Sequence, residues 1–145
     1  MIRAALVLSC ATVLLACGDG AATIQVEAFS PASRTGKLTQ YVGVGLGEPD
    51  FAPVLEPPCE LPCEETASFT TVEDNQEEIV IELFRGKTTS HKDARYLGTF
   101  LVTGLAHMPA DEPDVVVTFR ADLEGLSLSA VESTGVPVQL VKESR

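Results

Sequence analysis

Alternation of apolar and polar residues with a period of two is the feature that most restricts the fold of this chain. It recurs in seven short runs, which are YVGVGL, ASFTTV, EIVIELF, YLGTFLV, DVVVTFRA, LSLSAV and VPVQLV. A period of two places alternate side chains on the two faces of a strand, and no segment has a convincing helical pattern. The alternation therefore predicts an all-β chain.

Turn-forming residues separate these runs. Arg85-Gly86, Glu124-Gly125 and Thr134-Gly135 each lie between two alternating runs, where glycine permits the backbone angles of tight turns. Residues 48–62 are the exception, because their prolines and acidic residues leave room for little more than one short strand around Val54-Leu55. Many short strands with regular turns are typical of an antiparallel β-sandwich.

The start of the chain predicts a cleaved targeting segment. Residues 1–16, MIRAALVLSCATVLLA, carry one positive charge at Arg3 and then an apolar run that is too short to span a bilayer as a mature helix. These features indicate a signal peptide.

The signal peptide ends in Leu14-Leu15-Ala16-Cys17, which resembles the lipobox of bacterial lipoproteins. The resemblance implies that Cys17 is acylated and becomes the new N-terminus, and several acyl chains on one cysteine anchor a protein stably. We expect residues 17–39 to be a lipid-anchored tether with at most one short strand in TIQVEAF, followed by one sandwich domain over residues 40–145. The alternative is an ordinary secretory signal. The expected location is the bacterial cell envelope, in the periplasm or at the outer membrane.

The charge excludes nucleic acid as a partner. The formal net charge is −11, and it becomes −12 when the signal peptide and its Arg3 are removed. A surface this acidic repels phosphate backbones, and the sequence has no cluster of Lys and Arg that could form a groove for them.

Of the four cysteines, two remain for folding once Cys10 and Cys17 are assigned to the signal peptide and the lipid. In an oxidising envelope compartment Cys59 and Cys63 can form a disulfide. A zinc site needs more ligands than two cysteines, and His91 and His107 lie too far along the chain to have the usual ligand spacing from the cysteines. Two free thiols are the remaining alternative. We expect no metal.

A specific resemblance begins at residues 69–87, FTTVEDNQEEIVIELFRGK. This segment is similar to the β-rich substrate-binding domain of the heat-shock protein 70 chaperones, in which a Phe, a Ser/Thr pair and Glu-Asp-Asn-Gln lead into a strand and a glycine turn. More segments resemble the family in the same order: Val42 to Leu46, Tyr96 to Phe100, Thr103-Gly104-Leu105 with Pro109 and Pro113, Val115 to Phe119, and Asp122 to Ala130. The resemblance covers residues 40–141.

The parts of that family without a counterpart here are its nucleotide-binding domain, its interdomain linker and its helical lid. The sequence also has no glycine-rich phosphate loop, so we expect no nucleotide, no cofactor and no ATP-driven cycle. Where the family has Arg-Gly before the second proline, this chain has Ala110-Asp111. The lost arginine helps to latch the lid in the family, which agrees with the absence of a lid.

The resemblance implies a peptide-binding site between two loops, with a central pocket for a leucine-like side chain. Carried over position by position, apolar side chains build the pocket and two polar residues contact the peptide backbone. The apolar positions are Leu46, Phe69, Val72, Ile79, Ile81 and Val115, and the polar positions are Thr70 and Gln76.

Each of these patterns has a plainer interpretation. Apolar residues at alternate strand positions are more often sealed core than binding site, and Val72 and Ile79 replace smaller residues of the family, which could close the pocket. Residues 73–78 lack the spacing of a calcium loop and are better explained as a solvated acidic turn.

His91 and His107 are expected to lie in solvent. No Ser, His and Asp arrangement or carboxylate pair emerges, so we predict no enzyme activity and no catalytic residue.

Two hypotheses follow. The first is a lipid-anchored, ATP-independent module that binds extended or unfolded polypeptide segments. The second is a structural or interaction scaffold that keeps the sandwich but has a closed pocket, because a fold does not carry its function with it.

Overall fold

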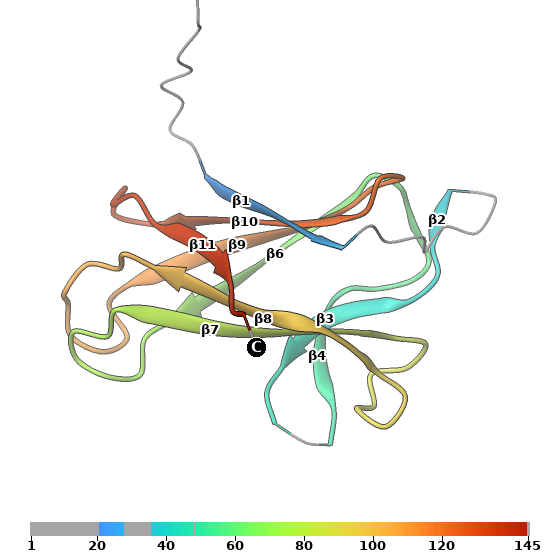
Figure 1. The fold of residues 1–145 in the computed structure, drawn as a ribbon, viewed down its shortest axis with the longest axis horizontal. Coiled ribbons are helices and arrows are strands. Elements are labelled where there is room, and N and C mark those ends of the chain that lie inside the picture. The colour runs from blue at the N-terminus through green and yellow to red at the C-terminus, as the bar shows by residue number, and fades with distance from the viewer. Residues whose placement is uncertain (1–20, 28–35, 48, 145) are drawn as a thin grey trace, which may run out of the picture.

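The computed structural model describes residues 21–27, 36–47 and 49–144, and all regular structure in them is β-strand (Figure 1). In chain order the strands are β1 Ala22–Glu27, β2 Lys37–Leu38, β3 Tyr41–Gly45, β4 Phe51–Leu55, β5 Cys59–Glu60, β6 Cys63–Thr70, β7 Glu78–Gly86, β8 Arg95–Thr103, β9 Asp114–Ala121, β10 Leu126–Glu132 and β11 Gln139–Lys142. No helix occurs in these ranges, which confirms the all-β prediction.

Two sheets form a sandwich, and they lie one above the other in Figure 1. The four-stranded sheet has the order β1-β10-β9-β6, and the five-stranded sheet has the order β11-β8-β7-β3-β4. A ribbon of β2 and β5 lies at one end. The strand pairings are antiparallel throughout, so the predicted antiparallel sandwich is confirmed.

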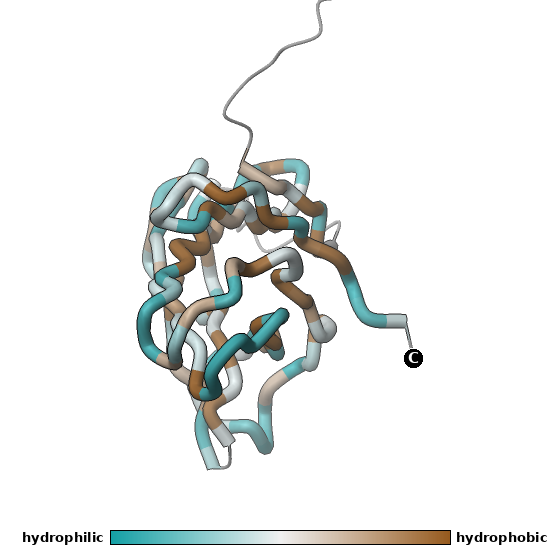
Figure 2. Tube along the Cα trace, turned by 90° about the vertical axis from the view of Figure 1, so that its left-hand side faces the viewer, coloured by the Kyte–Doolittle hydropathy of each residue, from teal (hydrophilic) through white to brown (hydrophobic). Residues whose placement is uncertain are grey.

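The core lies between the two sheets because alternate residues of each strand point inward. Hydrophobic and hydrophilic residues alternate along the trace in Figure 2. On β7 the odd-numbered residues from Ile79 to Leu83 are buried, and the even-numbered residues from Glu78 to Glu82 are exposed. The inward side chains of the central strands are among the most deeply buried in the described residues; they include Ile81, Leu83, Phe100, Val115, Phe119 and Leu128.

Strands β3 and β4 approach so closely at Gly43 that only glycine fits there. A Cβ atom at this position would lie 2.0 Å from the carbonyl oxygen of Ala52, which belongs to the rigid backbone of β4. Gly43 also lies at the register shift between these strands. The Val-Gly-Val-Gly alternation of β3 is therefore a packing requirement as well as a strand pattern.

A second, smaller cluster of rings lies on the outer face of the five-stranded sheet. We call it the outer aromatic cluster; it contains Phe51, Phe84, His91 and Tyr96. The ring centroid of Phe84 lies 4.6 Å from that of His91 and 5.5 Å from that of Tyr96. The ring of Phe51 stacks on that of Phe84 with a centroid distance of 6.1 Å. Phe51 is 2% exposed although it does not belong to the core between the sheets.

The outer aromatic cluster corrects the expectation that His91 lies in solvent. His91 belongs to the connection between β7 and β8, which folds back over the sheet. Backbone hydrogen bonds fix this connection: Phe51 N–H donates to Thr89 O at 2.9 Å and His91 N–H to Pro49 O at 3.0 Å. The ring of His91 is thereby held against Phe84, whereas His107 is exposed as expected.

Strand β1 lies in the segment that was expected to be a tether. It pairs with β10 from Ala22↔Ala130 to Glu27↔Leu126, and the side chain of Val26 is buried in the core. The sandwich thus includes strands that precede residue 40. The predicted signal peptide, the lipidation site at Cys17 and residues 28–35 lie outside the described residues.

The predicted disulfide between Cys59 and Cys63 is present. The Cα atoms are 6.0 Å apart, and the bond joins two different parts of the fold. Cys59 belongs to β5, which pairs with β2, and Cys63 begins β6, which pairs with β9. The disulfide therefore ties the β2–β5 ribbon to the four-stranded sheet. Cis peptide bonds precede Pro58 and Pro62 in the same segment.

Reduction of this disulfide should lower the free energy of unfolding by about 2 kcal/mol, because a cross-link over so short a loop removes little entropy from the unfolded chain. Urea denaturation with and without reductant measures the difference. The double variant Cys59→Ser, Cys63→Ser is the control and should not respond to reductant. Rapid alkylation of both thiols in the unreduced protein would contradict the assignment.

Phe51→Ala should lower the free energy of unfolding by about 3 kcal/mol, because it empties a buried ring position in the outer aromatic cluster. Val80→Ala is the matched control, since Val80 lies on the same face of the sheet but is 54% exposed; its cost should stay below about 1 kcal/mol. Equal destabilisation by both variants would show that the outer aromatic cluster adds no packing energy.

Candidate functional site

The turn between β6 and β7, residues 71–77, is built around one glutamine side chain. The Oε1 atom of Gln76 accepts hydrogen bonds from Val72 N–H at 3.0 Å and Glu73 N–H at 3.3 Å, and its Nε2 atom donates to Glu78 O at 2.6 Å. Asn75 has a φ of 55°, a left-handed conformation that asparagine tolerates better than most residues. The sequence Glu-Asp-Asn-Gln thus supplies both the support and the reversal of this turn.

Hydrogen bonds fix this turn to the loop between β8 and β9, residues 104–113. Both backbones and one carboxylate take part. The bonds run from Asn75 N–H to Met108 O at 2.8 Å, from Asp111 N–H to Thr71 O at 3.0 Å, and from Ala110 N–H to Asp74 Oδ1 at 2.9 Å. The two loops therefore form a single unit at one end of the sandwich.

The apolar floor of the predicted pocket combines residues from both sheets. Phe69 of β6 and Val115 of β9 are directly opposite each other in the four-stranded sheet, whereas Ile79 and Ile81 belong to β7 of the five-stranded sheet. Ile79, Ile81 and Val115 are members of the buried core, and the half-buried ring of Phe69 packs against it. The structure thus places all four side chains in or against the common core, and Ile79 is only 5% exposed.

The other two apolar residues of the predicted site lie on loops and face solvent. Leu46 follows β3 and is 76% exposed, and Val72 lies in the turn 71–77 and is 80% exposed. Six large apolar side chains are exposed in the described ranges, and Leu46 and Val72 are the two among them that occupy positions of the predicted site. They therefore differ from the floor residues, because they are available to a partner without any rearrangement.

The two predicted polar contacts are already used within the protein. Thr70 Oγ1 donates a hydrogen bond to Pro113 O at 2.7 Å, and the amide of Gln76 makes the three bonds that support the turn. Their function in this conformation is to hold the loops in place. A peptide backbone would have to use the remaining lone pairs of Thr70 or compete with the turn for Gln76.

Residues 108–111 belong to the same unit, which sequence reasoning missed except for one indirect signal. Asp111 occupies the position where the family has glycine, and its φ is 65°, so it adopts the backbone conformation that a glycine would take. The substitution Ala110-Asp111 was interpreted as the loss of a lid contact. The structure adds that both residues donate backbone hydrogen bonds to the turn 71–77.

The acidic residues of this region do not assemble into an ion site. Across the described ranges no group of three or more His, Cys, Asp or Glu side chains could hold a metal ion. Glu77 lies 3.5 Å from His107, and both side chains are exposed. The described residues contain no helix that is long and apolar enough to cross a membrane.

Comparison with known proteins matches this region to one family. The family model described as "Hsp70 protein" matches residues 48–142, about two thirds of the chain. This range contains the turn 71–77, the loop 104–113 and seven of the eight predicted site residues, all except Leu46.

Individual relatives give the same result. The chain is 34% identical over 82 residues to "Heat shock cognate 70 kDa protein 3" of Dictyostelium discoideum, covering 56% of this chain and 13% of that protein. It is 30% identical over 95 residues to "Heat shock cognate HSP70 protein" of Trypanosoma brucei brucei, covering 65% and 14%. A "Heat shock 70 kDa protein" of Trichophyton rubrum is 33% identical over 83 residues, covering 57% and 13%.

The chain thus spans about one seventh of the length of the curated relatives that it matches. The family model covers well over half of this chain and includes both loops of the candidate site. Together with the antiparallel sandwich, this match shows that the chain belongs to the Hsp70 protein family.

Proposed function

We propose that this chain is a lipid-anchored module of the bacterial cell envelope that binds extended or unfolded polypeptide segments without ATP. The observation that carries the proposal is the exposure of Leu46 and Val72, because both are positions of the predicted peptide site and neither contributes to the core. Membership of the Hsp70 family supports a chaperone-like role for the sandwich.

The energetics of such a site predict weak and rapidly reversible binding. Burial of one aliphatic side chain contributes about 1.5–3 kcal/mol, whereas a micromolar Kd requires roughly 8 kcal/mol. Backbone pairing with an extended segment must supply the remainder, and this requirement selects unfolded chains over folded surfaces.

Entry of a side chain into the central pocket requires a local rearrangement. Ile79, Ile81 and Val115 are packed in the core, and the partly buried ring of Phe69 packs against that core. The burial of this floor also favours the second candidate function, a scaffold whose pocket stays closed.

Val72→Ser and Leu46→Ser should each weaken binding of short unstructured peptides with a central leucine by about tenfold, because each removes one aliphatic contact. Leu123→Ser is the matched control: Leu123 is 75% exposed but lies in the β9–β10 turn. Fluorescence anisotropy with labelled peptides measures the affinities, and thermal melting checks that the variants fold. ATP should leave all affinities unchanged.

The scaffold hypothesis predicts a different result in the same experiment. Peptides would show no saturable binding to the wild-type protein, and Ile79→Phe would lower the free energy of unfolding by about 1–3 kcal/mol through overpacking. Absence of binding by the wild-type protein would therefore eliminate the peptide-binding proposal and leave the scaffold.

The proposed anchor at Cys17 would hold the sandwich close to the membrane. Strand β1 begins at Ala22, so the four residues between it and the proposed acylated cysteine can span at most about 17 Å. This distance is much shorter than a tether that continued to residue 39. A domain held this close can capture segments that emerge at the membrane surface.

Cys17→Ala should release the protein from the membrane fraction or block its processing, because it removes the acylated residue. Cell fractionation and gel mobility report both effects. Cys10→Ala is the control, since Cys10 lies within the segment that the signal peptidase removes. Unchanged fractionation and mobility of the Cys17→Ala protein would contradict the lipoprotein assignment.

A further inference from the structure

A row of aliphatic side chains is exposed on the outer face of the five-stranded sheet. Val80 of β7, Leu101 of β8 and Val141 of β11 are directly opposite one another in the antiparallel ladder, so they share one face. Val80 is 54% exposed and Val141 is 40% exposed, and Leu101 between them is partly buried. We call these three residues the outer aliphatic row. Because neighbouring strands lie about 4.8 Å apart, the row is about 10 Å long.

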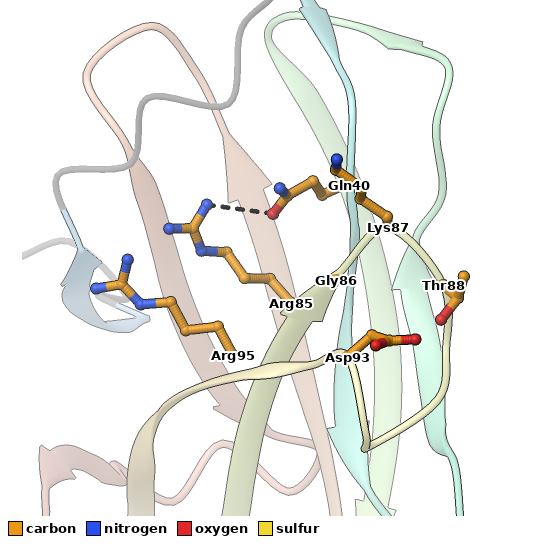
Figure 3. Close-up of a pocket in the computed structure, with 7 residues that line it drawn as sticks. All are labelled: Gln40, Arg85, Gly86, Lys87, Thr88, Asp93 and Arg95. Carbon is orange, nitrogen blue, oxygen red and sulfur yellow. Dashed lines mark hydrogen bonds between the residues drawn. The ribbon is translucent and has the colours of Figure 1, made fainter.

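The chain itself covers only the other end of this face. The outer aromatic cluster packs under the connection of residues 87–94, through the contact of His91 with Phe84. Figure 3 shows this connection leaving β7 at Lys87 and rejoining β8 at Arg95, which is the end of both strands away from the candidate peptide site. An antiparallel sheet normally has polar residues on its solvated face. A contiguous aliphatic row there indicates a surface that a partner covers.

Carboxylates flank the outer aliphatic row on both sides. Glu78 lies two residues before Val80 on the same face of β7, Glu82 lies two residues after it, and both are exposed. Glu143 N–H donates to Thr99 O at 2.9 Å, which continues the ladder and places Glu143 in the row of Glu82. The other members of the two flanking rows are neutral: Thr99, Thr103 and Gln139.

No base neutralises these carboxylates within the described ranges. The ion pairs found there include none of Glu78, Glu82 and Glu143. Lys142, which precedes Glu143, lies on the other face of the sheet, because its Nζ is 5.9 Å from the ring centroid of the buried Phe100. The surface therefore has an aliphatic centre and an acidic rim.

We propose that the outer aliphatic row binds an amphipathic helix of a partner protein, with Lys or Arg on both sides of its apolar stripe. Helical residues i, i+4 and i+7 lie on one face and span about 10 Å, which matches the length of the row. Basic residues beside such a stripe face the carboxylates on either side. An extended segment fits less well, since its side chains point only toward the sheet or away from it.

The charge argues against two other occupants. A symmetric contact between two copies of this chain would bring three carboxylates of each copy together, and each copy has a formal net charge of −11. Such a juxtaposition of like charges opposes association. A membrane surface rich in anionic lipids is repelled for the same reason.

The surface is also independent of the proposed peptide site. Val80 and the floor residue Ile79 point to opposite faces of β7, and Ile79 is buried where Val80 is exposed. A helix on the outer face can therefore bind whether or not the peptide pocket opens.

A synthetic peptide of about 14 residues, enough for roughly four helical turns, tests the proposal with the wild-type protein. The peptide carries a leucine stripe with lysine on both sides. We expect saturable amide NMR shifts at Val80, Leu101 and Val141, and a gain of helical circular dichroism from the peptide. A peptide of the same composition in scrambled order should bind about tenfold more weakly.

The double variant Val80→Thr, Val141→Thr should weaken binding of the helical peptide by about tenfold, because it removes aliphatic contacts while it keeps the β-branched shape that suits a strand. Val131→Thr is the matched control, since Val131 is 50% exposed but lies on β10 of the other sheet. Its affinity should stay within about twofold of the wild type.

The double variant Glu78→Gln, Glu82→Gln should also weaken binding by about tenfold and reduce its dependence on salt, because it removes two charges of the rim. Glu124→Gln, an exposed position in the β9–β10 turn, is its control. Equal binding of the scrambled peptide, shifts confined to the turn 71–77, or binding that survives in both double variants would overturn the proposal. Binding without a gain of helix, or dimerisation through the row, would assign it to another occupant and overturn the proposal as well.

Discussion

Burial of alternate side chains between the two sheets is the constraint on which the rest of this structure depends. The inward residues of β7 and β8 meet those of β9 and β10, and the most deeply buried rings, Phe100 and Phe119, come from opposite sheets. Because the side-chain period is two, a one-residue slip in any strand would expose its apolar set. The register is therefore fixed by the core, and the register in turn determines which loops meet at each end.

Most strands could be predicted because their signal is local. The alternating runs correspond to β3 and β6–β11, and the breakers at Arg85-Gly86 and Glu124-Gly125 lie at strand ends. Features that depend on the exact path of a turn were not predictable. Glu132 lies in phase with buried residues of β10 and is itself 1% exposed, and its carboxylate accepts hydrogen bonds from Thr134 and Val136; the sequence pattern alone does not distinguish it from an exposed acid.

The candidate site could be predicted in composition but not in geometry. Family resemblance identified the floor residues and the two flanking positions, and the structure groups the former in the core while it leaves Leu46 and Val72 on the surface. The resemblance did not indicate that Gln76 and Thr70 would satisfy their hydrogen bonds internally. These bonds depend on the exact path of the loops, which a pattern of residue types does not encode.

The outer aromatic cluster divides the apolar interior into two units that share one sheet. Its rings and the connection over residues 87–94 contact the outer face of β3, β4 and β7, whereas the main core lies on the inner face. Such a unit can open by itself while the sandwich stays folded. Amide protons at Thr89 to His91 would then exchange with solvent through subglobal opening, at a free energy lower than that of the central strands. The main core would thus stay closed while the outer aromatic cluster opens locally.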